Sequence, residues 1–128
     1  MFWRQLMKTN GLIEIIVYVA DMDAQVRFYR DVFGLEVTYP AGLDNYADQF
    51  WVTLDAGGVL LALHGGGQGR LGSDTPKIVF GVDDIHAARA ALIQKGVNVD
   101  EIRSAAPGVW VCDGRDPEGN PFSIESHD

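Results

Sequence analysis

The chain has 128 residues, of which 47% are hydrophobic and 22% are charged, and its formal net charge at pH 7 is −8. These values are ordinary for a single globular domain that can bury a stable core without disulfide or metal support. The acidic balance, with no stripe of Lys or Arg, argues against nucleic acid and anionic membranes as partners.

Targeting and redox features are few. Cys112 is the only cysteine, which excludes an intrachain disulfide and a cluster of thiolate metal ligands. No apolar run approaches the ~18 residues that a membrane-spanning helix needs. Residues 1–10 lack the apolar core of a signal peptide, so we expect them to form a short N-terminal arm of a cytoplasmic protein.

The first half of the chain predicts a strand, a helix and three more strands. Residues 12–20 are rich in Ile, Val and Tyr, which favour a strand. An aspartate then begins an amphipathic helix over about 24–33, and Gly34 ends it. Short apolar runs predict the strands that follow, at 36–39, 49–54 and 59–64.

The second half repeats this order. A strand is predicted at 77–82, then a helix that Asp83 or Asp84 begins and Gly96 ends. Strands are predicted at 97–102, 109–112 and 122–125. We therefore predict two βαβββ modules, about residues 11–64 and 77–126, joined by the glycine-rich loop 65–76. One helix covers only one face of each sheet, so the two free faces should enclose a cavity.

Two stretches resemble a known family. VADMDAQVRFYRDVFGLEV, from residue 19 to residue 37, and DPEGNPFSIES, from 116 to 126, look like signatures of the vicinal oxygen chelate superfamily. That superfamily holds glyoxalases, bleomycin resistance proteins and extradiol dioxygenases. The resemblance covers about residues 11–126. It implies one α+β domain in which tandem βαβββ modules form curled mixed sheets around a cavity.

The resemblance also implies four positions at which family enzymes hold a divalent metal through His, Glu or Gln. In this chain they fall on Glu14, Ala62, Lys77 and Ser123. Only Glu14 suits a metal, because an alanine methyl and a lysine ammonium cannot coordinate one. We therefore expect no cofactor. The open alternative is a divalent metal held by Glu14 and by His64, which shares a strand face with Ala62.

Glu14 raises its own question, because an unpaired carboxylate among apolar residues is costly. In the internal repeat Glu14 and Lys77 occupy equivalent places. We hypothesise that they form an ion pair in the cavity, with hydrogen bonds from Tyr18, His64 or Ser123.

Other side chains are candidates for ligand contact. Trp51 and Trp110 fall on corresponding strands and, with Tyr18, either belong to the core or form aromatic walls for a planar or cationic ligand; we prefer the walls. Arg115 either binds a ligand anion or pairs with a nearby aspartate. The full candidate ligand-binding set is Tyr18, Trp51, Lys77, Trp110, Arg115, Ser123 and Glu125.

Two kinds of function fit this pattern. The first is binding of a small organic molecule in the cavity, without the family's metal. The alternative is a metal-dependent lyase, isomerase or dioxygenase in which Glu14 and His64 are the catalytic residues. A homodimer is expected in either case, because it would cover exposed sheet edges.

Overall fold

A computed structural model describes residues 14–66 and 76–128 of the chain. The first module consists of β1 (Glu14–Tyr18), α1 (Met22–Asp31), β2 (Glu36–Tyr39), β3 (Trp51–Asp55) and β4 (Leu60–His64). The second consists of β5 (Ile78–Gly81), α2 (Ile85–Gln94), β6 (Arg103–Ala106), β7 (Val109–Arg115) and β8 (Pro121–His127). This order confirms the tandem βαβββ pattern. The predicted arm, residues 1–10, and most of the predicted loop lie outside the described residues.

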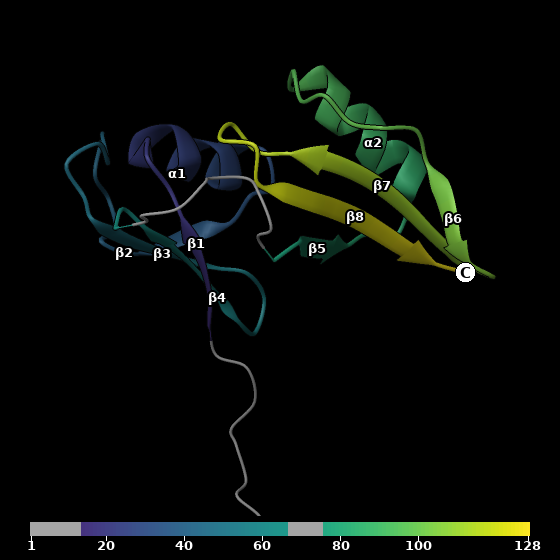
Figure 1. Cartoon of the computed structure of the whole chain (residues 1–128), viewed down its shortest axis with the longest axis horizontal. Coiled ribbons are helices and arrows are strands. Elements are labelled where there is room, and N and C mark those ends of the chain that lie inside the picture. Colours follow the sequence, from purple (N-terminus) through teal and green to yellow (C-terminus); the bar gives the residue numbers. More distant parts are fainter. Residues whose placement is uncertain (1–13, 67–75) are drawn as a thin grey trace, which may run out of the picture.

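Each module forms its own four-stranded mixed sheet, with strand orders β1-β4-β3-β2 and β5-β8-β7-β6. The first strand of each module runs parallel to the last, and the other neighbours are antiparallel. The modules lie side by side with both helices on the same side (Figure 1). The α+β fold class is confirmed, but the two sheets share no strand pairing and are not closed around a cavity within one chain.

The helices begin and end where local chemistry predicts. Asp21 precedes α1 and Asp84 precedes α2, and each carboxylate accepts a hydrogen bond from the backbone N–H three residues later, at 3.1 and 3.0 Å. Gly34 and Gly96 follow the helices with φ of 71° and 82°, a conformation that costs glycine little.

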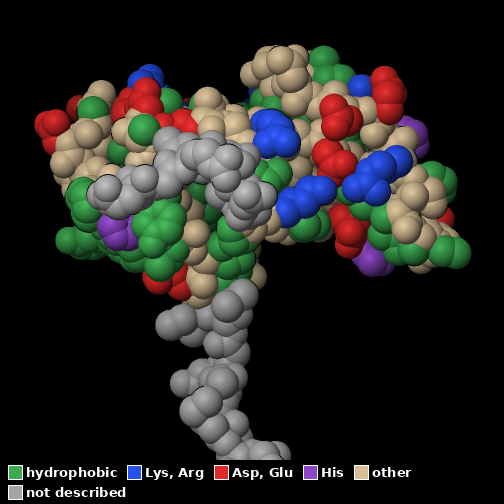
Figure 2. Space-filling model, viewed as in Figure 1, with side chains coloured by type: hydrophobic (Ala, Val, Ile, Leu, Met, Phe, Trp, Pro, Cys, Tyr) green, Lys and Arg blue, Asp and Glu red, His purple; other side chains and the backbone are tan. Residues whose placement is uncertain are grey.

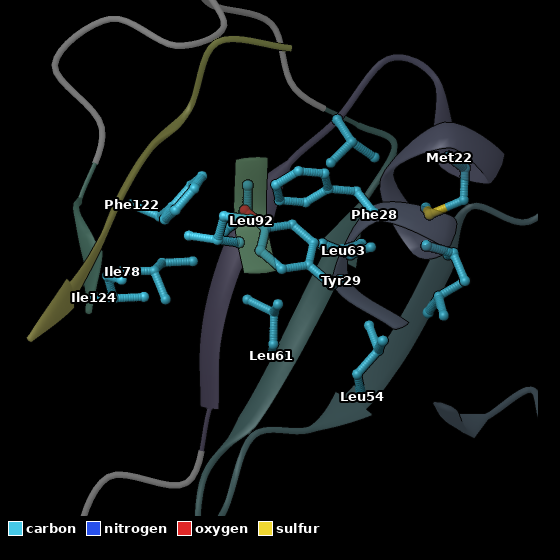
Figure 3. Packing of buried hydrophobic residues seen from close by; sticks show 14 of the residues in the cluster. Met22, Phe28, Tyr29, Leu54, Leu61, Leu63, Ile78, Leu92, Phe122 and Ile124 are labelled. Atoms are coloured by element: carbon cyan, nitrogen blue, oxygen red, sulfur yellow. The ribbon is translucent and has the colours of Figure 1, made fainter. Parts of the chain in front are cut away.

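The hydrophobic core joins the two modules. Phe28 of α1 and Phe33, which follows the helix, contact Phe80 and Phe122 of the second sheet. Phe33 stacks on Phe80 with ring centroids 4.3 Å apart, and Phe28 lies 5.8 Å from Phe122. Figure 3 shows Phe28 and Tyr29 pointing into the space between the strands of both modules. Helix α1 thus packs against both sheets.

One predicted strand is wrong. Residues 97–102 form no strand, and β6 begins instead at Arg103. Val99 makes only an isolated bridge to Gly114, while Val97 and Val99 pack against the core. Their alternating pattern therefore reflects burial of an irregular segment. A buried strand would show the same period-two spacing, so the sequence pattern does not distinguish the two.

Candidate functional site

The candidate site begins on the face of the first sheet that is turned away from α1. Strand alternation sends Val52, Leu61 and Leu63 into the core beneath α1. The residues between them point the other way, and the register pairs them across the strands. These outer-face residues are Glu14, Ile16 and Tyr18 of β1, Leu60, Ala62 and His64 of β4, and Trp51, Thr53 and Asp55 of β3.

Four rings gather at one end of this face, and we call Tyr18, Phe50, Trp51 and His64 the aromatic wall. The register places Tyr18, His64 and Trp51 side by side on adjacent strands. The His64 ring centroid lies 5.1 Å from that of Tyr18, 4.9 Å from that of Phe50 and 5.5 Å from that of Trp51. Tyr18 and Phe50 remain 47% and 63% exposed. Figure 2 shows apolar side chains around a histidine on this module.

Glu14 and His64 are not brought together. Glu14 pairs in register with Leu60, whereas His64 pairs with Tyr18 at the other end of the same two strands. Four residues of strand separate the two positions by about 13 Å. That spacing is too long for a proton relay between the side chains or for two ligands of one metal ion.

The outer face of the second sheet, turned away from α2, carries a polar cluster around Asp113. The Asp113 carboxylate accepts hydrogen bonds from Lys77 Nζ at 2.6 Å, Ser123 Oγ at 2.5 Å and Arg103 Nε at 3.1 Å. Burial alone would raise the pKa of Asp113, but these three donors outweigh it and lower the pKa to about 2. Asp113 is therefore a fixed negative charge.

The predicted ion pair between Glu14 and Lys77 is wrong. Lys77 forms its ion pair with Asp113, which lies within its own sheet. Ser123, which was expected to support Glu14, also donates to Asp113. The cause is topological: β5, β8 and β7 are neighbours in one sheet, whereas Glu14 lies in the other.

Two other candidates, Glu125 and Arg115, also lie apart from the aromatic wall. Glu125 is on the second outer face and lies 2.8 Å from Nε2 of His127. Arg115 donates from Nη1 to the carbonyl oxygen of Gly119 at 2.7 Å, which anchors the turn between β7 and β8. Its guanidinium thus has a local structural contact.

A pocket shared with Trp51 would require Trp110 to lie on the outer face of the second sheet. Trp110 lies on the opposite face of that sheet. It pairs with Ser126, while the neighbouring Val111 pairs with Glu125 of the outer face. Its Nε1 donates to Asp128 at 3.2 Å. Trp110 lines a separate surface hollow of about 810 Å³ together with residues of α2.

A second hollow, of about 770 Å³, lies at the seam between the modules. Phe28 of α1 and Val32, which follows the helix, form one side, and Lys77, Asp113 and Arg115 are among its charged lining residues. The structure thus brings two predicted ligand contacts, Lys77 and Arg115, into one depression, but away from the aromatic wall.

Sequence reasoning missed Phe50, Arg103 and Asp113. Phe50 precedes β3 and joins the wall only because the chain bends there, for which no sequence signal exists. Asp113 had a usable signal, since a lysine next to an apolar strand, such as Lys77, favours a nearby carboxylate partner. Arg103 lies on a strand that was placed incorrectly.

At three of the family's four metal positions, all except Glu14, the side chains do not match the ligands that such a metal needs. Ala62 offers a methyl group, Lys77 an ammonium group held by Asp113, and Ser123 a hydroxyl that donates to the same carboxylate. None of these is an imidazole or a free carboxylate. Within residues 14–66 and 76–128, no three His, Cys, Asp or Glu side chains converge as a metal site would require.

Two open mixed sheets, each built from a βαβββ module, define a glyoxalase-like fold. The chain belongs to the Glyoxalase/Bleomycin resistance protein/Dioxygenase superfamily, whose family model matches residues 11–124. No curated protein matches the chain significantly. Neither α1 nor α2, the helices of the described part, is long and apolar enough to cross a bilayer.

Solved structures share the fold across nearly the whole chain. TnmS3, an antibiotic binding protein from Streptomyces sp. CB03234, is 21% identical with a TM-score of 0.79, over 96% of this chain and all of its own. Lactoylglutathione lyase from Agrobacterium tumefaciens is 22% identical with a TM-score of 0.72, covering 94% of this chain and 96% of its own. The integron cassette protein VCH_CASS1 from the mobile metagenome of V. cholerae is 24% identical with a TM-score of 0.73, over 97% and 100%.

Proposed function

We propose that this protein binds a small organic molecule with a planar apolar part, and that it does so without a divalent metal. The observation that carries the proposal is the aromatic wall, in which three rings surround His64 and two of them remain largely exposed. Exposed rings gathered on one sheet face favour stacking with a flat ligand. Binding of a small organic molecule is compatible with this fold, since TnmS3 is an antibiotic binding protein.

The metal-dependent alternative is weaker on geometry. It requires Glu14 and His64 to act on one centre, and their register positions are about 13 Å apart. The other family positions supply a methyl, an engaged ammonium and an engaged hydroxyl. A role in binding needs none of these groups.

We further propose that two copies associate, so that the second outer face of one chain covers the aromatic wall of the other. Both faces expose apolar side chains: Ile16 is 39% exposed and Val79 is 50% exposed. Val79→Asp should convert the dimer to a monomer in light scattering, whereas Ile93→Asp, on the exposed side of α2, should not. A monomeric wild-type protein at tens of micromolar would contradict the dimer.

The binding proposal is tested by titrating ¹⁵N-labelled protein with a library of planar aromatic fragments. We expect shifts centred on Tyr18, Trp51 and His64. Trp51→Ala should weaken binding at least about fivefold, because a stacking ring contributes about 1 kcal/mol or more. Trp110→Phe serves as the control and should leave affinity unchanged. Fragments that bind only at the hollow lined by Trp110 would overturn the proposal.

A further inference from the structure

We propose that His64 is a specificity-determining donor: its Nε2–H group hydrogen-bonds an acceptor oxygen of the bound molecule. The ligand class is thereby narrowed to planar aromatic compounds that carry a carbonyl or oxyanion. This inference rests on the proposed function and concerns the same site.

The backbone fixes the tautomer of His64. The N–H of Gly66 donates a hydrogen bond to Nδ1 of His64 at 2.8 Å. A neutral imidazole carries one N–H group and one acceptor nitrogen, and a nitrogen that accepts a hydrogen bond carries no proton. The proton of the neutral ring is therefore on Nε2.

Glycine is required for this contact. A Cβ added at Gly66 would lie 2.6 Å from Cε1 of His64 and 2.8 Å from Cζ of Phe50, which is closer than real Cβ contacts. The preceding residue, Gly65, donates its N–H to the carbonyl oxygen of Phe50 at 2.8 Å and fixes the turn. The chain after β4 thus folds tightly against the ring, and only a residue without a side chain permits this.

The other nitrogen is available to a ligand. Among residues 14–66 and 76–128, Nε2 of His64 has no hydrogen-bond partner, although the ring is half-buried. Tyr18, Phe50 and Trp51 hold the ring from three sides and set its direction. A donor held in apolar surroundings discriminates strongly between ligands with and without an acceptor, because an unpaired donor is costly there.

The same tautomer disfavours His64 as a metal ligand through Nε2. Coordination at Nε2 would place the proton on Nδ1, where it would face the N–H of Gly66. The hydrogen bond from Gly66 to Nδ1 therefore favours Nε2 of His64 as a hydrogen-bond donor over Nε2 as a metal ligand.

The tautomer is measured by long-range ¹H–¹⁵N NMR of the full chain at about pH 8, where histidine side chains are ordinarily neutral. We expect the nitrogen shifts of the Nε2–H form for His64. Gly66→Ala should disturb this pattern, while Gly81→Ala, which has open space around the added methyl, should not. An Nδ1–H form in the wild-type protein would overturn the inference and leave the proposed function standing.

The ligand class is tested with a matched pair of probes, 9-fluorenone and fluorene, which differ by one carbonyl group. We expect fluorenone to bind about three- to tenfold more tightly, the range of one hydrogen bond. His64→Phe should abolish this preference, and His64→Gln, which retains an amide donor, should keep part of it. Equal affinities of the wild-type protein for the two probes would contradict the proposed role of His64 but not the proposed function. Failure of both probes to perturb the aromatic wall would contradict the proposed function.

Discussion

The carboxylate of Glu118 accepts hydrogen bonds from the backbone N–H of Ala20, at 2.7 Å to Oε1 and 3.0 Å to Oε2. Glu118 also accepts the N–H of Asp21 at 2.7 Å and Nε2 of Gln25 at 2.8 Å. It lies in the turn between β7 and β8, whereas its donors lie at the start of α1. One side chain of the second module therefore binds the two backbone N–H groups that precede α1 and a side chain of its first turn, and its charge complements the helix dipole.

Removal of this contact should destabilise the protein. Glu118→Ala is expected to lower the free energy of unfolding by about 1–3 kcal/mol, since several backbone donors lose a charged acceptor. Urea denaturation followed by circular dichroism measures the change. Glu101→Ala is the control, because the Glu101 side chain is 92% exposed and its contact with Arg89 is long. Equal effects of the two substitutions would contradict a structural role for Glu118.

The buried Tyr29 hydroxyl should contribute a second connection between the modules. It donates to Oδ2 of Asp116 at 2.9 Å, and burial together with the charge of Asp116 raises the pKa of Tyr29 well above its usual range. Tyr29→Phe is expected to cost about 1–2 kcal/mol of unfolding free energy. Tyr39→Phe, at a position that is 63% exposed, should be nearly neutral. Loss of stability in Tyr39→Phe but not in Tyr29→Phe would contradict the stabilising role of the Tyr29 hydroxyl.

Asp113 should make stability depend on acid pH. Its folded-state pKa of about 2 lies below the ordinary aspartate value. The stabilisation is therefore complete above about pH 4 and is lost as the pH falls towards 2. Asp113→Asn should be less stable than wild type near pH 7, and the difference should shrink between about pH 4 and 2. The measurement is urea unfolding at several pH values, with the exposed Asp48→Asn as control. A difference that is constant with pH would exclude the proposed charge effect.

Divalent metals should not affect binding at the aromatic wall. The affinity for 9-fluorenone is expected to be the same after treatment with a chelator and after addition of Ni²⁺, Zn²⁺ or Mn²⁺. Isothermal titration calorimetry with each metal and with the ligand provides the comparison. A stoichiometric metal that His64→Ala removes, and that changes ligand affinity, would favour the enzymatic alternative instead.

The sequence by itself determined most of the elements and their repetition. Asp21, Gly34 and Gly96 act within one helical turn of their own position, so their effects can be read locally. The strand parity that placed His64 on the same face as Ala62 also depends only on neighbouring residues. The family signatures cover the same elements, and the fold class follows from them.

Only the tertiary structure decided which side chains meet. Lys77 pairs with Asp113 because strand order within the second sheet sets its neighbours, and strand order is not encoded in any local pattern. Trp110 lies on the opposite face from its expected position because a difference of one residue in strand register reverses the direction of every side chain. The tautomer of His64 likewise depends on a backbone N–H beyond its strand. Local propensities act over a few residues, whereas these contacts depend on how distant strands are placed.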